Sequence, residues 1–187
     1  MNVIKTAIDG VLIIEPAVYS DARGYFFEVW NDASYRAAGV PVCNWRQDNE
    51  SKSCYGVVRG LHYQAAPYAQ AKLVRAVYGS VLDVVVDIRK GSPTFGQHIS
   101  VELSGENKRQ LFIPRGFAHG FAVLTQEAVF AYKCDSLYCE ASERGIAFDD
   151  PTLAIDWHIP PEKRILSQKD LQRPLLAQIE PYEELNQ

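Results

Sequence analysis

Positive charge and long apolar runs are both scarce in this sequence. Its 19 Lys and Arg against 23 Asp and Glu give a net charge of −4, which argues against nucleic acid or an anionic membrane surface as a partner. No segment approaches the roughly 18 apolar residues of a membrane span. The N-terminal apolar run covers only residues 11–14, too short for a signal peptide. We therefore expect a cytoplasmic globular protein with no nucleic-acid or membrane partner.

Cysteine is also sparse, and its spacing fits neither a metal site nor a redox motif. Cys43, Cys54, Cys134 and Cys139 include no CxxC pair. Because disulfides are rare in the cytoplasm, we interpret all four cysteines as reduced thiols.

Turn-forming residues recur at short intervals between segments with strand patterns. Strands are predicted at residues 80–88, 98–103, 110–114 and 128–133. No repeat, low-complexity tract or flexible linker divides the 187 residues, and no long helices alternate with the strands, which argues against a parallel α/β sheet. We predict a single, mainly β domain over residues 1–187, folded as an antiparallel barrel or sandwich.

Two short helices are predicted outside these strands. The segment NDASYRAAG offers Asn31 as the N-cap and Gly39 as the C-terminal stop. The segment SQKDLQ, residues 167–172, places Ser167 and Asp170 at capping-box spacing.

The segment IPRGFAHGF, residues 113–121, carries a Pro-x-Gly-x-x-His pattern that ends at His119. This pattern resembles the second conserved motif of the cupins, which are small double-stranded β-helix (jelly-roll) barrels. In metal-binding cupins the other ligands come from a His-x-His motif and a following glutamate. Here His62 is present, but Gln64 takes the second histidine position and no glutamate follows. Because a transition-metal site needs three or more converging ligands, we expect no metal and no cofactor.

The surroundings of His62 point to a different use for this histidine. One strand-forming segment of fourteen residues, from Arg59 to Lys72, contains both of these cations and the His62 imidazole. Such a cluster indicates an anionic ligand with a group to be deprotonated. For His98 and His158, which lack these neighbours, we expect structural positions in the core or at its rim.

Spaced blocks over residues 4–174 together resemble the dTDP-4-dehydrorhamnose 3,5-epimerase family, which makes the L-rhamnose precursor. The blocks are DARGYFFE (21–28), QDNESKS (47–53), VVRGLHYQ (57–64), SPTFGQ (92–97), LSQKD (166–170) and the longer segments 69–89 and 103–121. The resemblance implies a cupin barrel with a few short helices, including a C-terminal helical segment. It also implies a dTDP-4-keto-6-deoxyhexose substrate, and a homodimer in which N-terminal strands cross to the partner.

The resemblance assigns four residues to proton transfer at C3 and C5, which both lie α to the C4 ketone. His62 would be the base, since its unperturbed pKa near 6.5 suits proton abstraction near neutral pH. Asp170 would orient the His62 ring. Lys72 would stabilise the enolate at the C4 oxygen, and Tyr132 would return the proton from the opposite face.

Each of these assignments has a structural alternative when the residues are taken alone. Asp170 fits a helix cap with Ser167, and a carboxylate does not easily serve two partners at full strength. Lys72 fits a solvent-facing lysine at a strand start. Tyr132 fits an aromatic core position in a β-strand.

Further residues match substrate-binding positions of the family. Arg23 and Arg59 would clamp the diphosphate bidentately, whereas Gln47 and Asn49 would offer paired donors and acceptors to a pyrimidine edge. The other matching residues are Glu28, Asp48, Lys72, His119, Tyr138, Glu143 and Lys169. Among these, Tyr138 is expected to stack on the base. Without the resemblance, Arg23 fits a turn with a surface salt bridge, and Glu28, Gln47 and Asn49 fit exposed loops.

Three functions remain open besides double inversion. A related enzyme could invert only C3 or only C5, although Tyr132 favours both. A non-catalytic cupin that binds a nucleotide sugar would have no use for His62, Lys72, Tyr132 and Asp170 together. A metal-dependent cupin oxygenase is disfavoured by Gln64.

Overall fold

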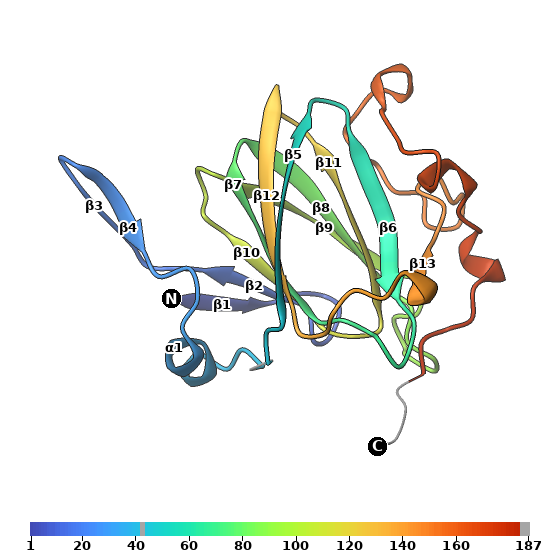
Figure 1. Ribbon diagram of the computed structural model, residues 1–187, viewed down its shortest axis with the longest axis horizontal. Helices are drawn as coiled ribbons and strands as arrows, with labels where there is room; N and C mark the ends of the chain where they lie inside the picture. Colours follow the sequence, from blue (N-terminus) through green and yellow to red (C-terminus); the bar gives the residue numbers. More distant parts are fainter. Residues whose placement is uncertain (42–43, 184–187) are drawn as a thin grey trace.

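The computed structural model describes residues 1–41 and 44–183, which form two antiparallel β-sheets that face each other (Figure 1). In spatial order, the six-stranded sheet contains β1 (Asn2–Lys5), β2 (Leu12–Glu15), β10 (Gln110–Ile113), β7 (Lys72–Tyr78), β12 (Glu127–Cys134) and β5 (Gln47–Cys54). The five-stranded sheet contains β13 (Glu143–Gly145), β6 (Val58–Gln64), β11 (Phe117–Val123), β8 (Ser80–Asp87) and β9 (His98–Ser104). The predicted mainly β class is confirmed.

The local sequence patterns place the main elements correctly. All four predicted strands are present, as β8, β9, β10 and β12. The first predicted helix is α1 (Asp32–Ala37), whose N-cap Asn31 accepts hydrogen bonds from two backbone N–H groups of the first turn. Gly39 follows with φ +83°, the left-handed conformation that ends many helices.

The second predicted helix is shorter than its sequence indicated. Only one 3-10 turn forms, η3 (Asp170–Gln172). Arg173 then takes an extended conformation, as expected for a residue before proline, here Pro174. Three further 3-10 turns are η1 (Glu140–Ser142), η2 (Pro161–Lys163) and η4 (Leu176–Gln178).

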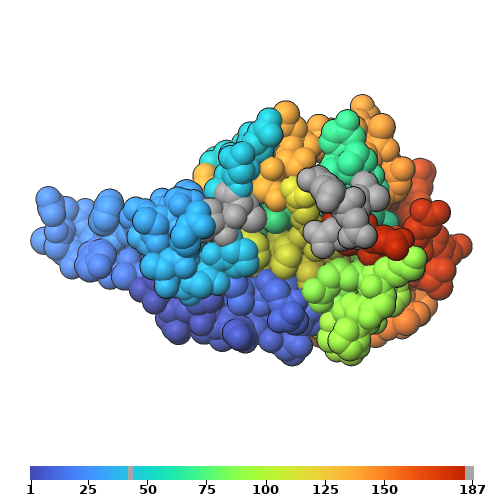
Figure 2. All heavy atoms as spheres, turned by 90° about the horizontal axis from the view of Figure 1, so that it is seen from below, coloured from blue at the N-terminus to red at the C-terminus, as the bar shows by residue number. Residues whose placement is uncertain are grey.

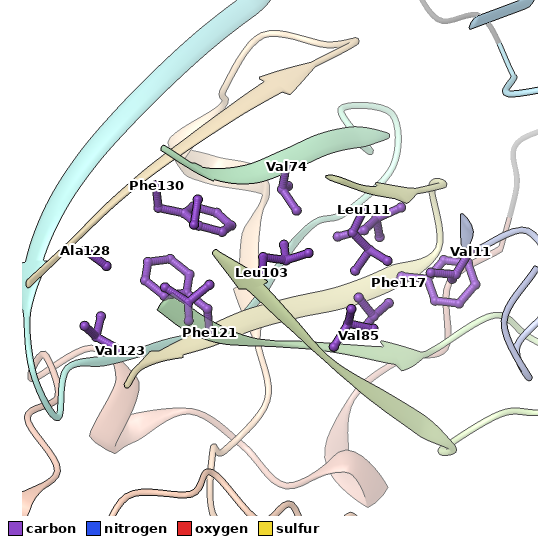
Figure 3. Close-up of a cluster of buried hydrophobic side chains, with 14 of the residues drawn as sticks. Val11, Val74, Val85, Leu103, Leu111, Phe117, Phe121, Val123, Ala128 and Phe130 are labelled. Carbon is purple, nitrogen blue, oxygen red and sulfur yellow. The ribbon is translucent and has the colours of Figure 1, made fainter. Parts of the chain in front are cut away.

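The space between the two sheets is filled by apolar side chains from both (Figure 3). Phe121 of β11 and Phe130 of β12 stack there, with ring centroids 4.3 Å apart. Burial of such large apolar surfaces is the main stabilising contribution to a fold of this kind. The aromatic pair therefore ties the two sheets together.

A second apolar cluster covers the opposite face of the five-stranded sheet. Leu61 of β6 and Val84 of β8 pack there against Ile146, Leu153 and the fully buried Trp157. The chain after β13 thus lies along the outside of this sheet, beside β6 (Figure 1). This arrangement brings η3 next to the strand that carries His62.

The hairpin of β3 (Val18–Asp21) and β4 (Gly24–Phe27) projects away from both sheets (Figure 1). In Figure 2 the same arm extends in blue from one end of the molecule. Its aromatic side chains are largely uncovered, with Tyr19 67% exposed and Phe26 70% exposed. Exposed aromatic surface of this extent commonly marks an interaction site.

The described cysteines and helices agree with the expectations of reduced thiols and of no membrane span. Cys54, Cys134 and Cys139 are free thiols, whereas Cys43 lies outside the described residues. Across residues 1–41 and 44–183, no helix is both long and apolar enough to cross a membrane.

Candidate active site

His62 projects from β6 toward the space between the sheets. Its neighbours Leu61 and Tyr63 belong to the second apolar cluster, on the outer face of the five-stranded sheet. Side chains alternate along a strand, so His62 points to the inner face. The side chain remains 34% exposed, and its Nε2 lies 2.5 Å from Oδ1 of Asp170 in η3. The expected imidazole–carboxylate pair is therefore formed, and Nδ1 has no partner among the described residues.

Asp170 uses its two oxygens for two different partners. Oδ1 contacts His62, while Oδ2 accepts a hydrogen bond of 2.9 Å from the Ser167 hydroxyl. Burial alone would raise the pKa of Asp170, but the hydrogen bond and charge of His62, the Ser167 hydroxyl and the charge of Arg173 lower it below its ordinary value. The predicted capping box forms only in part, since the Asp170 backbone N–H donates to Ser167 Oγ at 3.1 Å, whereas the N-cap of η3 is Lys169, which makes no side-chain cap. The carboxylate itself is held ionised beside the imidazole.

Lys72 begins β7 and lies within the protein rather than in solvent. Burial lowers the pKa of Lys72, against the opposing influence of Cys134 and Asp83. Its Nζ lies 5.9 Å from the centroid of the Tyr132 ring, and it forms no ion pair with any carboxylate of the described chain. A buried ammonium without a counter-ion is suited to meet an anion that forms during a reaction.

Tyr132 lies on β12 and packs, partly buried, against the apolar cluster between the two sheets. Burial and the neighbouring Cys134 raise the pKa of its phenol, although Arg59 acts in the opposite direction. The phenol is consequently protonated at neutral pH and is available as an acid.

A second imidazole–carboxylate pair lies deeper between the sheets. His119 of β11 contacts both oxygens of Asp83 of β8, at 3.1 and 2.9 Å from Nε2. Burial raises the pKa of Asp83, which the charges of His119 and Lys72 partly oppose. The sequence analysis did not assign Asp83 a role. The available signal was a carboxylate inside a strand that is otherwise apolar, since a buried charge needs a partner.

His119, Lys72 and Gln64 approach one another from three strands. Together, His119, Lys72 and Gln64 line a small cavity of about 10 Å³. His119 also lies directly opposite His62 in the β11–β6 ladder. Gln64 has an amide side chain, and its Oε1 accepts a hydrogen bond from the Cys139 backbone N–H at 3.2 Å. Gln64 therefore anchors the loop after β12.

A polar cluster lies at the start of β5. Gln47 Oε1 accepts a hydrogen bond of 2.9 Å from the Tyr138 backbone N–H, and its Nε2 donates to Asn49 Oδ1 at 3.0 Å. Asp48 forms an ion pair of 2.6 Å with Lys133. The structure thus brings together Gln47, Asn49 and Tyr138, which the sequence predicted to meet the base.

The sequence of this chain matches one family of proteins over most of its length. The sequence profile described as dTDP-4-dehydrorhamnose 3,5-epimerase matches residues 5–178. The chain belongs to this family. A dTDP-4-dehydrorhamnose 3,5-epimerase from Shigella flexneri is 55% identical over 171 residues, which cover 91% of this chain and 93% of the relative.

Two solved epimerase structures share the fold of this chain. The epimerase of Legionella pneumophila in complex with dTDP-4-keto-L-rhamnose is 50% identical, with a TM-score of 0.92 and coverage of 98% of both chains. A 3′-monoepimerase from Streptomyces bikiniensis in complex with dTDP-quinovose is 36% identical, with a TM-score of 0.86 over 95% of this chain and 88% of that chain. The predicted cupin-like fold is confirmed.

Glu143 of β13 connects several residues that the family resemblance assigns to substrate binding. Its Oε2 accepts a hydrogen bond of 2.6 Å from the Tyr138 hydroxyl and lies 3.8 Å from Lys169 Nζ. Its Oε1 is paired with Arg173. Bonding to Glu143 raises the pKa of Tyr138 to about 12, so this tyrosine stays neutral over the range in which an epimerase works.

Arg23 and Glu28 lie apart from the epimerase site within a single chain. Arg23 lies at the tip of the projecting hairpin, 91% exposed and ion-paired with Asp21 at 2.6 Å. Glu28 follows β4 and accepts a hydrogen bond from Asn31 at 2.9 Å. Arg59 stays on β6, where its Nε donates to Ser53 Oγ at 3.2 Å.

The other two histidines occupy positions outside the epimerase site. His98 is part-buried on β9, where burial lowers its pKa, and His158 lies on an exposed turn 3.8 Å from Asp156. Within the described part of the chain, no group of three or more His, Cys, Asp or Glu side chains is placed to hold a metal ion.

Proposed function

We propose that this chain inverts C3 and C5 of dTDP-4-dehydro-6-deoxy-D-glucose to give dTDP-4-dehydro-L-rhamnose, a step of dTDP-L-rhamnose biosynthesis. It is thereby an isomerase, as its family relatives are named. The observation that carries the proposal is the 2.5 Å contact between His62 and Asp170. Lys72, whose Nζ lies 5.9 Å from the centroid of the Tyr132 ring, lines a cavity with His119, the residue opposite His62 in the ladder. A protein that only binds a nucleotide sugar has no need of this acid–base set.

The pairing of His62 determines which nitrogen acts as the base. Because Nε2 is engaged by Asp170, a neutral ring carries its proton on Nε2 and presents the Nδ1 lone pair to substrate. Nδ1 removes the proton from carbon, and the Asp170 carboxylate then stabilises the imidazolium that forms.

Removal of that proton places negative charge on the C4 oxygen as an enolate. The Lys72 ammonium stabilises this charge without reorganisation, because it is already buried. Tyr132 donates its phenolic proton to the carbon from the opposite face, which inverts the centre. His62 then releases its proton to solvent and Tyr132 regains one from solvent, so that the same sequence at the other carbon completes the double inversion.

The remaining site residues hold the substrate. We propose that Arg59 and His119 contact its diphosphate and sugar, and that Tyr138 stacks on the base beside Gln47, Asp48 and Asn49. Glu143 and Lys169 line the same side. The close contacts of Tyr138 with Gln47 and Glu143 support this placement.

We also propose that the single domain of residues 1–187 works as a homodimer in the cytoplasm. The projecting hairpin carries Arg23 and Glu28 together with the exposed Tyr19 and Phe26. An exchange of this arm would cover the aromatic surface and supply Arg23 and Glu28 to the partner's site. Light scattering of the wild type and of Phe26→Asp tests this proposal, since a charge in the buried interface should shift the dimer toward monomer.

Inversion of one carbon only is the second candidate function, because a 3′-monoepimerase shares the fold. Incubation with dTDP-4-keto-6-deoxyglucose in D2O separates the two by NMR. Deuterium at both C3 and C5, with inverted products, supports double inversion. Deuterium at one carbon supports the second candidate, and binding without exchange contradicts both.

A further inference from the structure

Arg173 connects the turn that carries Asp170 to the edge of the five-stranded sheet. It follows η3 directly, its side chain is 15% exposed, and its guanidinium donates to Glu143 Oε1 on β13. Because Asp170 lies at the start of η3 and Arg173 at its end, this contact fixes the turn to the sheet.

The strand that Arg173 contacts is paired with the strand of His62. In the β13–β6 ladder, Gly145 lies opposite His62 and Glu143 opposite Gln64. A Cβ at position 145 would lie 2.8 Å from both Cδ and Nε of Arg173, closer than real contacts allow. The Arg173 side chain therefore lies directly against the backbone beside His62, in space that glycine leaves open.

Fold stability alone does not explain this buried cation. Arg173 Nε is buried without any hydrogen-bond partner in the described chain, which is energetically unfavourable. A buried ion pair contributes little net stability, because desolvation offsets the attraction. The arrangement calls for a role other than holding the fold together.

The carboxylate that receives Arg173 is itself held from the other side. The Tyr138 hydroxyl donates to Glu143 Oε2 at 2.6 Å, so Glu143 cannot rotate freely. Arg173 is thus tied to a fixed anchor, and its charge also helps to lower the pKa of Asp170.

We infer that Arg173 is a positioning residue that holds the Asp170 carboxylate against His62 and thereby keeps the base in its reactive tautomer. This inference rests on the proposed epimerase function. The charged and titratable groups around Asp170 and Arg173 are His62 and Tyr63 from β6, Glu143 from β13, and Lys169 from the η3 segment.

A double-mutant cycle tests the inference on the full chain. Arg173→Gln should lower kcat between about 10- and 100-fold, as expected for a displaced catalytic group, with a smaller change in KM. In an Asp170→Asn background, the same substitution should change kcat by less than about 3-fold, because its effect acts through Asp170. Equal losses in both backgrounds, or wild-type kcat in Arg173→Gln, would overturn it.

Two further variants guard against a trivial loss of fold. Arg173→Lys keeps the charge and should retain more kcat than Arg173→Gln at an unchanged melting temperature. Arg164→Lys is the matched control, since the Arg164 guanidinium donates to the Ile159 backbone carbonyl at 3.0 Å and forms no ion pair within the described chain. It should behave as the wild type.

A spectroscopic readout separates this inference from the proposed reaction. In protein with 15N-labelled histidine, the ring shifts of His62 report which nitrogen carries the proton, without any substrate. The Nε2-protonated form should dominate in the wild type and lose population in Arg173→Gln. An unchanged tautomer refutes the inference, whereas a wild type that fails to turn over substrate refutes only the function.

Discussion

The Asp170 carboxylate lies 2.5 Å from His62 Nε2, although 108 residues separate the two along the chain. The contact exists because the segment after β13 packs along the outside of the five-stranded sheet and returns to β6. The imidazole base and its orienting carboxylate are therefore assembled by packing rather than by a local motif.

Asp170→Asn should lower kcat by about 100-fold or more, because the amide cannot stabilise an imidazolium as a carboxylate does. The fold should persist, since an amide still accepts from the Ser167 hydroxyl. Steady-state kinetics and thermal unfolding measure the two effects. Asp156→Asn, at a 78% exposed side chain, is the control and should keep wild-type turnover and stability. Full turnover with a lowered melting temperature in Asp170→Asn would make the carboxylate a cap only.

Lys72→Met should lower kcat by about 100- to 1,000-fold, the usual effect of removing one group that stabilises an oxyanion. Its melting temperature should stay the same or rise, because a part-buried cation that forms no ion pair in the described chain is replaced by an apolar side chain. Lys52→Met is the matched control, as Lys52 is 62% exposed and paired with Glu127. A Lys72→Met enzyme as fast as the control would exclude Lys72 from the reaction.

Tyr132→Phe should separate proton removal from inversion. The base remains, so deuterium from D2O should still enter the substrate, but inverted product should form at least about 100-fold more slowly without the acid. NMR measures exchange and inversion in one sample. Tyr78→Phe, at a 63% exposed tyrosine of β7, should leave both rates unchanged. Normal inversion by Tyr132→Phe would mean that another group returns the proton.

Asp87→Asn should weaken the fold at neutral pH without a direct effect on the reaction. Burial would raise the pKa of Asp87, but hydrogen bonds from Arg89, Ser92 and Thr94 lower it to about 2. Its folded-state pKa lies below the unfolded value, so ionisation stabilises the protein above about pH 4 by roughly 2 kcal/mol, and this contribution is lost as the pH falls toward 2.

Thermal unfolding of Asp87→Asn between pH 2 and 7 tests this linkage. The variant should be less stable than the wild type at neutral pH, and the difference should shrink in acid. Asp156→Asn, at a 78% exposed side chain, supplies the control. A stability difference independent of pH would attribute the effect to packing instead of charge.

Local patterns were sufficient for much of the secondary structure. Alternation identified β8 and β9, and the Asn31 cap and Gly39 located α1, because these signals depend on neighbours within a few residues. The second helix was overestimated, since the sequence Arg173–Pro174 ends η3 after one turn. The family resemblance supplied the proposed roles of His62, Lys72 and Tyr132, which alternation alone did not separate from core positions.

Long-range contacts supplied what no local pattern contained. The pairing of Asp83 with His119 joins strands 36 residues apart, and sequence analysis recognised only the histidine. Arg173 carried no motif, and it lies close to Gly145 because the next residue, Pro174, accepts a hydrogen bond of 2.8 Å from the Ala147 backbone N–H. Arg23 and Glu28 matched family positions, yet one chain leaves them on a projecting arm.

The sequence by itself determined the β class, the family and the set of side chains available for acid–base chemistry, because composition and spacing express residue identity. Only the tertiary structure decided which carboxylate meets which imidazole, and that Lys72 is part-buried with no ion pair among the described residues. The physical reason is that pKa values and hydrogen bonds depend on distance and burial in space. Asp170 reaches His62 because Leu61, Trp157 and their neighbours hold the segment after β13 against β6.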